Sequence, residues 1–158
     1  RHNEVCGGKG LTKDRGTHVP LICNWPGTIS DQVIKDLVDS SDFLPTILET
    51  AGIETPPGFI MDGKSFYPQL KGEKGNPREW MFFHFDPMSP RDDNSSSPAA
   101  SRPSVRFVRG KRWKLYEDGR LYDLHNDRDE EIPFLQTNDD SEKSSVRKHL
   151  FDVFDQMR

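Results

Sequence analysis

Residues 104–124 read SVRFVRGKRWKLYEDGRLYDL, and this stretch decides the fold. It contains three short runs rich in β-branched and aromatic side chains, SVRFVR, RWKLY and RLYDL, which are typical of β-strands. Gly110 and Lys111 can turn the chain after the first run, and the sequence from Glu117 to Gly119 is a hairpin signal between the last two. The stretch therefore predicts a meander of antiparallel strands.

The flanking sequence adds a fourth strand and a helix. Residues 80–85, WMFFHF, form another aromatic run, and the Pro/Ser/Asp-rich insert at 87–104 that follows is expected to be a mobile loop. At 144–157, apolar side chains recur at helical spacing, so one helix face should lie on the sheet. These side chains are Val146, Leu150, Phe151, Phe154 and Met157. The expected fold class is α+β, a four-stranded antiparallel sheet with a packed C-terminal helix.

Residues 19–52 predict one more strand, which would belong to a larger sheet, and one more helix. Residues 19–25, VPLICNW, form a continuous apolar run, which suits a strand buried on both faces of a larger sheet. Asp42 is a plausible N-cap for a helix that Gly52 ends. The side chains expected to share one face of this helix are Phe43, Ile47, Leu48 and Ala51. Residues 53–77 are rich in proline and glycine and indicate an irregular connector.

Composition limits the classes of partner. The formal net charge is -4 and the mean hydropathy is -0.81, so nothing favours binding to nucleic acid or to an anionic bilayer. No apolar run approaches the roughly 20 residues that span a membrane. Without an initiator Met, the chain is expected to be part of a longer protein. Cys6 and Cys23 could pair or could be buried thiols, and the sequence leaves both open.

Residues 7–10, GGKG, place Lys9 between glycines. A phosphate-binding P-loop would need glycine where Asn3 stands and Ser or Thr where Gly10 stands, so that motif is excluded. A cation remains on backbone that glycine lets approach a ligand closely. Spacing alone favours a solvated loop lysine over a lysine that meets an anion.

Five segments, taken in order, favour a lysine that meets an anion, because together they resemble the C-terminal part of the sulfatase family. The segments are GGKGLTKDRGTHVPLICNWPG (7–27), DFLPTILETAG (42–52), MDGKSFYPQLKG (61–72), REWMFFH (78–84) and GRLYDLHNDRDE (119–130). The resemblance implies that residues 1–75 are the tail of a large α/β domain and that residues 76–158 are the C-terminal antiparallel-sheet subdomain. It also implies a sulfuric ester hydrolase in a periplasmic, extracellular or lysosomal compartment, with the preceding domain of the same protein as a partner.

The resemblance assigns roles to a few residues. Lys9 matches the lysine that contacts the substrate sulfate, and Asp14 takes the acidic position that follows. His84 lies in a region that borders the substrate cleft in similar proteins, although a structural histidine on an aromatic strand is the simpler interpretation. His18 and Arg128 replace the family's usual arginine and proline, so any ion pair of that arginine is in doubt here.

The same resemblance implies cofactors that this chain cannot supply. Similar sulfatases use a formylglycine, made from Cys or Ser in Cys/Ser-x-Pro-x-Arg, and a calcium ion, both held upstream of the lysine loop. Cys6 begins CGGKG and Cys23 begins CNWPG, so neither fits, and Ser101 lacks the arginine. We therefore expect no metal ligand in this chain, and no activity from this part alone.

Two alternatives remain open. A non-catalytic module could bind sulfated or acidic glycans through the basic hairpin residues Arg109, Lys111 and Arg112, although the charges from Arg109 to Lys114 are expected to alternate onto the solvated face of the hairpin. A related phosphatase or phosphonate hydrolase is also possible, because a lysine does not distinguish sulfate from phosphate. The acidic run at 127–131 is expected to be solvated, since it lacks the spacing of a calcium loop.

Overall fold

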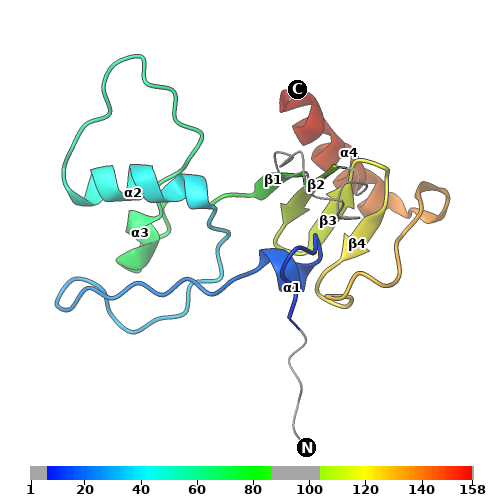
Figure 1. Cartoon of the computed structure of the whole chain (residues 1–158), viewed down its shortest axis with the longest axis horizontal. Coiled ribbons are helices and arrows are strands. Elements are labelled where there is room, and N and C mark those ends of the chain that lie inside the picture. Colours follow the sequence, from blue (N-terminus) through cyan, green and yellow to red (C-terminus); the bar gives the residue numbers. More distant parts are fainter. Residues whose placement is uncertain (1–6, 87–103, 158) are drawn as a thin grey trace, which may run out of the picture. The chain divides into compact units, whose positions relative to one another are not determined.

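A computed structural model describes residues 7–86 and 104–157 (Figure 1). Its centre is a four-stranded sheet in the order β1-β2-β3-β4. The strands are β1 (Trp80–Phe85), β2 (Val105–Gly110), β3 (Trp113–Tyr116) and β4 (Leu121–Asp123). All four strands lie where the sequence predicted them, and the predicted α+β class is confirmed. Residues 87–103, where a mobile loop was expected, and Cys6 lie outside the described residues.

Turn residues set the register of the meander. Phe107 pairs with Tyr116 across β2 and β3, and Lys114 pairs with Tyr122 across β3 and β4, both antiparallel. In the β3–β4 turn, the N–H of Gly119 donates to the carbonyl of Tyr116 at 2.9 Å, and Gly119 has φ of 91°. Glycine adopts that conformation without the steric penalty that a side chain would bring.

The two faces of the sheet carry different layers. Phe82 packs edge-on against Phe154 of α4 (Ser141–Gln156), with ring centroids 5.9 Å apart, so the helix covers that face. The next residue, Phe83, points to the opposite face and stacks on Phe107 at 4.6 Å. A cluster of buried side chains on this opposite face comprises Phe107, Tyr116, Tyr122 and Leu124.

Helix α4 begins at an N-cap and carries a buried arginine. The Asp140 carboxylate accepts from the N–H of Lys143 at 2.9 Å, which satisfies one of the free donors of the first turn. Leu150, Val153 and Phe154 are buried, whereas Met157, predicted for the same face, is exposed. Arg147 is buried as well; it pairs with Asp139 at 2.6 Å and donates to the carbonyls of Gly119 and Phe134.

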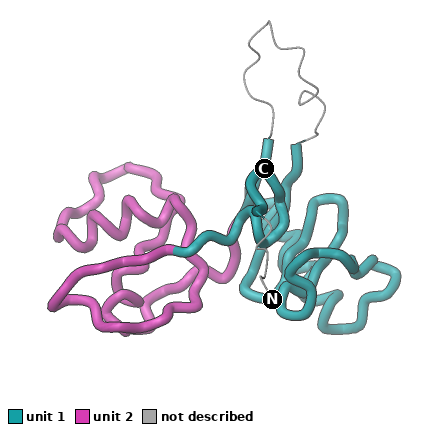
Figure 2. The backbone as a smooth tube through the Cα atoms, turned by 60° about the horizontal axis from the view of Figure 1, so that its bottom comes forward, with its two compact units in different colours: residues 1–20, 82–158 teal, residues 21–81 magenta. Residues whose placement is uncertain are grey.

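Residues 21–81 form a second compact unit, separate from the sheet unit of residues 7–20 and 82–157 (Figure 2). Its helices are η1 (Ser40–Asp42), α2 (Phe43–Thr50) and α3 (Tyr67–Leu70). Asp42 is the N-cap of α2, as predicted, although its side chain makes no capping hydrogen bond there; Asp39 caps η1 and forms a capping box with Asp42. The Asp42 carboxylate is buried and is held by Arg78 at 2.6 Å.

The prediction of a strand at residues 19–25 is wrong. These residues form no strand and are exposed, with Ile22 86% exposed. A strand buried on both faces needs hydrogen-bonding neighbours on either side, and the described residues offer none at this place. On α2, Phe43 and Ile47 of the predicted shared face are also exposed, by 42% and 62%.

The division of the chain at residue 75 stays a prediction. Residues 7–20 group with the sheet and not with residues 21–81, so the two compact units follow a different boundary. Within the described ranges, no helix is long and apolar enough to cross a membrane.

Candidate functional site

The site begins with residues 8–18, called here the Lys9 loop. The N–H of Leu11 donates to the carbonyl of Gly8 at 2.9 Å, and Gly10, with φ of 77°, completes the turn. A Cβ on Gly8 would lie 2.2 Å from the carbonyl oxygen of Arg15, and one on Gly16 would lie 2.2 Å from that of Leu11. Only glycine permits these approaches, so the loop folds tightly on itself.

Lys9 lies at the exposed tip of this loop. It forms no ion pair with any other described residue, whereas many cations of the sheet unit are paired with carboxylates. An ammonium group in this position can bind an anion without first breaking an ion pair with another described residue.

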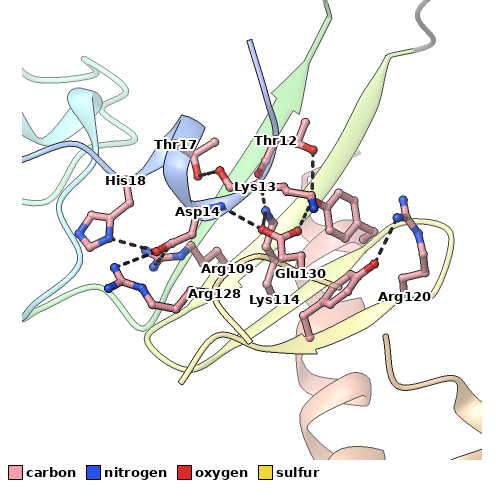
Figure 3. Close-up of polar contacts among 12 residues, drawn as sticks. Thr12, Lys13, Asp14, Thr17, His18, Arg109, Lys114, Arg120, Arg128 and Glu130 are labelled. Atoms are coloured by element: carbon pink, nitrogen blue, oxygen red, sulfur yellow. Dashed lines mark hydrogen bonds and ion pairs between the residues drawn. The ribbon is translucent and has the colours of Figure 1, made fainter. Parts of the chain in front are cut away.

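Asp14 starts the single turn α1 (Asp14–Thr17) and anchors the loop to β2 (Figure 3). Its buried carboxylate accepts from Arg109 at 2.6 Å and from Arg128 at 3.2 Å. His18 Nδ1 lies 3.4 Å from the same carboxylate, so an ion-pair partner is present where the family's arginine is replaced. Burial raises the pKa of Asp14, but Arg109, Arg128 and His18 outweigh it and hold the pKa below its usual value.

Glu130 is the second anchor, buried beside Asp14 (Figure 3). One carboxylate oxygen accepts from the N–H of Asp14 at 3.0 Å and from Lys114 Nζ at 2.7 Å. The other oxygen accepts from the Tyr116 hydroxyl at 2.5 Å, and that hydroxyl lies 3.1 Å from Thr12 Oγ1. Lys114 Nζ also donates to the carbonyl of Thr12. Asp14 is thus joined to β3 through the Glu130 carboxylate, and Thr12 is joined to β3 directly.

Burial changes the acidities of the β3 groups in this network. Lys114 is fully buried, with its ammonium 4.1 Å from the centre of the Phe107 ring. Burial lowers its pKa to about 8, although the hydrogen bond that Lys114 donates to Glu130 works in the opposite direction. Burial and Glu130 both raise the pKa of Tyr116 above its usual value. The partners of Lys114 therefore favour its charged form, whereas burial disfavours it.

Two sequence interpretations of the charged residues are wrong. Arg109 and Lys114, expected on a solvated face, are buried, because residues 8–18 and 127–130 cover the face they share with Phe107. Glu130, expected to be solvated with its acidic neighbours, is buried for the same reason.

The structure does not bring His84 into the network. His84 is exposed on β1, and no hydrogen bond or ion pair joins it to the Lys9 loop among the described residues. Its proposed contact with substrate stays a prediction. Cys23 is a free, exposed thiol.

Sequence reasoning missed most of the anchoring network. The missed residues are Thr12, Arg109, Lys114, Tyr116 and Glu130. A signal was present: in strand alternation, Arg109 lies on the same face as Phe107, and Lys114 on the same face as Tyr116. Charged side chains on an otherwise aromatic face indicate a covered polar network.

The described residues contain no group of three or more His, Cys, Asp or Glu side chains that could hold a metal ion. The donor set that calcium requires, several oxygen ligands converging on one point, is therefore not found in the described part of this chain. No catalytic step through a metal can be derived from these residues.

Comparison with known proteins gives the family. Residues 8–158 match the model of the N-sulphoglucosamine sulphohydrolase C-terminal family. Arylsulfatase A of Bos taurus is 30% identical over 151 residues, which cover 80% of this chain and 30% of that protein. A sulfatase of Formosa agariphila is 32% identical over 141 residues, covering 82% of this chain and 25% of that protein.

Solved structures agree with the sequence match. A 2-O GAG sulfatase has a TM-score of 0.50 and 26% identity, and the match covers 73% of this chain and 23% of that one. A protein solved with its substrate D-glucosamine-2-N,6-O-disulfate has a TM-score of 0.52 and 22% identity over the same shares, a likeness of fold. The chain thus spans less than a third of each of these relatives. It belongs to the N-sulphoglucosamine sulphohydrolase C-terminal family and is similar to part of the sulfatases named above.

Proposed function

We propose that this chain is the part of a sulfuric ester hydrolase that supplies Lys9 to the substrate sulfate. The observation that carries the proposal is an exposed lysine without an ion-pair partner in the described chain, at the tip of a loop whose base is fixed by buried Asp14 and Glu130. The family match and the ordered motifs around Lys9 support it.

The proposed role of Lys9 is electrostatic. A cation placed opposite the sulfate oxygens stabilises negative charge that develops on them as the ester bond breaks. A fixed loop contributes more than a flexible one, because little reorganisation is needed at the moment of reaction. The formylglycine and the calcium ion expected in the full-length enzyme would be held by residues outside this chain.

We further propose that residues 19–25 and the open face of α2 contact the preceding domain of the same protein. Val19, Ile22 and Ile47 are all more than 60% exposed, an unusual surface for a chain that otherwise carries many charges. The relatives named above supply an occupant, since 70% or more of each lies outside the matched region.

The glycan-binding alternative has weaker support. Arg109 is buried on Asp14, and Arg112 pairs with Asp123 at 2.8 Å and with Glu142 at 3.0 Å. Two of the three cations it requires are therefore already neutralised. Salt-sensitive binding of a sulfated glycan by the 158-residue chain, lost on reversing the charge of Lys111, would restore that alternative.

The test is Lys9→Ala in the full-length protein, assayed with a nitrophenyl sulfate. Turnover should fall by about 100- to 1000-fold, the effect of removing one fixed charge-stabilising group. Lys13→Ala is the matched control, because Lys13 lies in the same loop and its hydrogen bonds to other described residues are made by its backbone carbonyl and not by its side chain. Near-normal turnover of the Lys9 variant would reject the assignment, and hydrolysis by the purified 158-residue chain at enzyme-like rates would reject the need for a preceding domain.

A further inference from the structure

We propose that Glu130 is a positioning residue that fixes Lys9 by clamping the base of the Lys9 loop to β3. The inference rests on the proposed function of Lys9. Glu130 itself would not touch substrate; it would act through the loop.

Glu130 connects the Lys9 loop to β3 through three hydrogen bonds. Its carboxylate accepts the backbone N–H of Asp14 at 3.0 Å and, on the same oxygen, Lys114 Nζ at 2.7 Å. The Tyr116 hydroxyl binds the other oxygen at 2.5 Å and reaches Thr12 Oγ1 at 3.1 Å. Every donor comes from either the loop or β3, so the carboxylate joins these two segments and little else.

The chain between the Glu130 contacts and Lys9 is tightly folded. Asp14 and Thr12 lie five and three residues beyond Lys9, and the intervening chain is closed by the Leu11–Gly8 hydrogen bond and by the close contacts of Gly8 and Gly16. A shift at Asp14 therefore moves the turn as a unit. A displacement of about 1 Å at a catalytic group can lower turnover about 100-fold.

Glu130 has an unusual backbone conformation. Its φ is 53°, in the left-handed region, and it is the one non-glycine residue with positive φ among the described residues. Asparagine and glycine adopt this conformation more readily than glutamate. A residue that keeps an unfavourable backbone while its carboxylate receives three donors indicates that the side chain is needed at this point.

A purely structural role is the competing explanation, because breaking a buried ion pair usually destabilises a fold whatever the pair does. Loss of activity in a Glu130 variant would fit both explanations. Dependence on Lys9 separates them: a residue that acts by placing Lys9 has nothing to place once the lysine is gone.

The test is a double-mutant cycle in the full-length protein with Glu130→Gln and Lys9→Ala. Glu130→Gln keeps the size of the side chain and removes its charge, and it should lower kcat by about 10- to 100-fold. In the Lys9→Ala background, the same change should lower kcat by less than about twofold. An equal loss in both backgrounds would overturn the positioning role while leaving Lys9 in place. Normal turnover of Lys9→Ala alone would instead reject the proposed function.

The test includes a control variant and a second variant of the Glu130 contacts. Glu117→Gln is the matched control, since Glu117 holds an exposed ion pair with Arg106 on the same sheet and should leave kcat unchanged. If Glu130→Gln does not fold, Tyr116→Phe removes one donor and the contact to Thr12 while keeping the ring. It should lower kcat by about 3- to 10-fold, and again not in the Lys9→Ala background; an equal loss in that background would overturn the proposal.

Hydrogen exchange on the 158-residue chain provides a readout other than activity. Glu130→Gln should speed exchange of the Asp14 amide by about tenfold or more beyond any acceleration of sheet amides such as that of Tyr116. Uniform acceleration across loop and sheet would show general destabilisation and would count against positioning.

Discussion

The sheet unit, residues 7–20 and 82–157, and the unit of residues 21–81 differ in where most of their charged and large apolar side chains lie. The first buries charged groups, among them Asp14, Lys114 and Glu130, and each is paired. The second also buries a charged group, Asp42 on Arg78, but it leaves more large apolar side chains exposed than the first does, among them Ile22 and Ile47. Buried charges indicate a unit whose polar interactions are complete within this chain, and exposed apolar groups indicate a surface that another part of the protein covers.

Lys114→Ala should produce the largest difference between the units. It leaves Glu130 buried without its cation, and we expect a loss of about 3–5 kcal/mol in the free energy of unfolding of the sheet unit. Hydrogen exchange, followed separately for α4 and α2, would measure it. The double variant Lys114→Met with Glu130→Gln is the control and should recover part of the loss; equal destabilisation of both units by Lys114→Ala would break the comparison.

The pH dependence should give an intermediate effect, again confined to the sheet unit. The folded-state pKa of Lys114 is about 8, below its ordinary value of 10.5, so the unfolded chain binds more protons between these values. The free energy of unfolding should therefore rise from about pH 8, by about 1–3 kcal/mol. Above about pH 10 the raised pKa of Tyr116 acts in the opposite direction, because the unfolded chain then loses its phenolic proton first.

Denaturant unfolding of the native chain and of Lys114→Met across this range would check the prediction. The variant should lack the rise, while other lysines titrate alike in both proteins. A rise of equal size in the variant would show that Lys114 does not titrate as the structure indicates.

Ile22→Ser should have the smallest effect on the 158-residue chain, within about 0.5 kcal/mol, because the side chain is already 86% exposed. In the full-length protein the same change should lower the melting temperature by several degrees if the preceding domain covers this residue. Asn24→Ser, at an exposed neighbour, is the control. Equal melting of the Ile22 variant and the native full-length protein would remove the case for that interface.

Local patterns predicted much of the fold. The aromatic runs and Gly119 located the four strands and the last turn, because strand alternation and positive φ are properties of short sequences. The helix at 43–50 and the C-terminal helix were located from apolar spacing and Gly52. The strand at 19–25 failed because an apolar run forms a strand only where other strands bind it.

Sequence alone determined the four strands, the two main helices, the family resemblance and Lys9 as the candidate that meets sulfate. Only the tertiary structure decided that Arg109, Lys114 and Glu130 are buried partners of the Lys9 loop. Their contacts join residues far apart in the chain. Arg109 lies 95 residues from Asp14, and Glu130 lies 116 residues from Asp14, whose backbone N–H donates to it. Whether a charge on a strand is solvated depends on which distant segment covers that face, and local sequence does not contain that information.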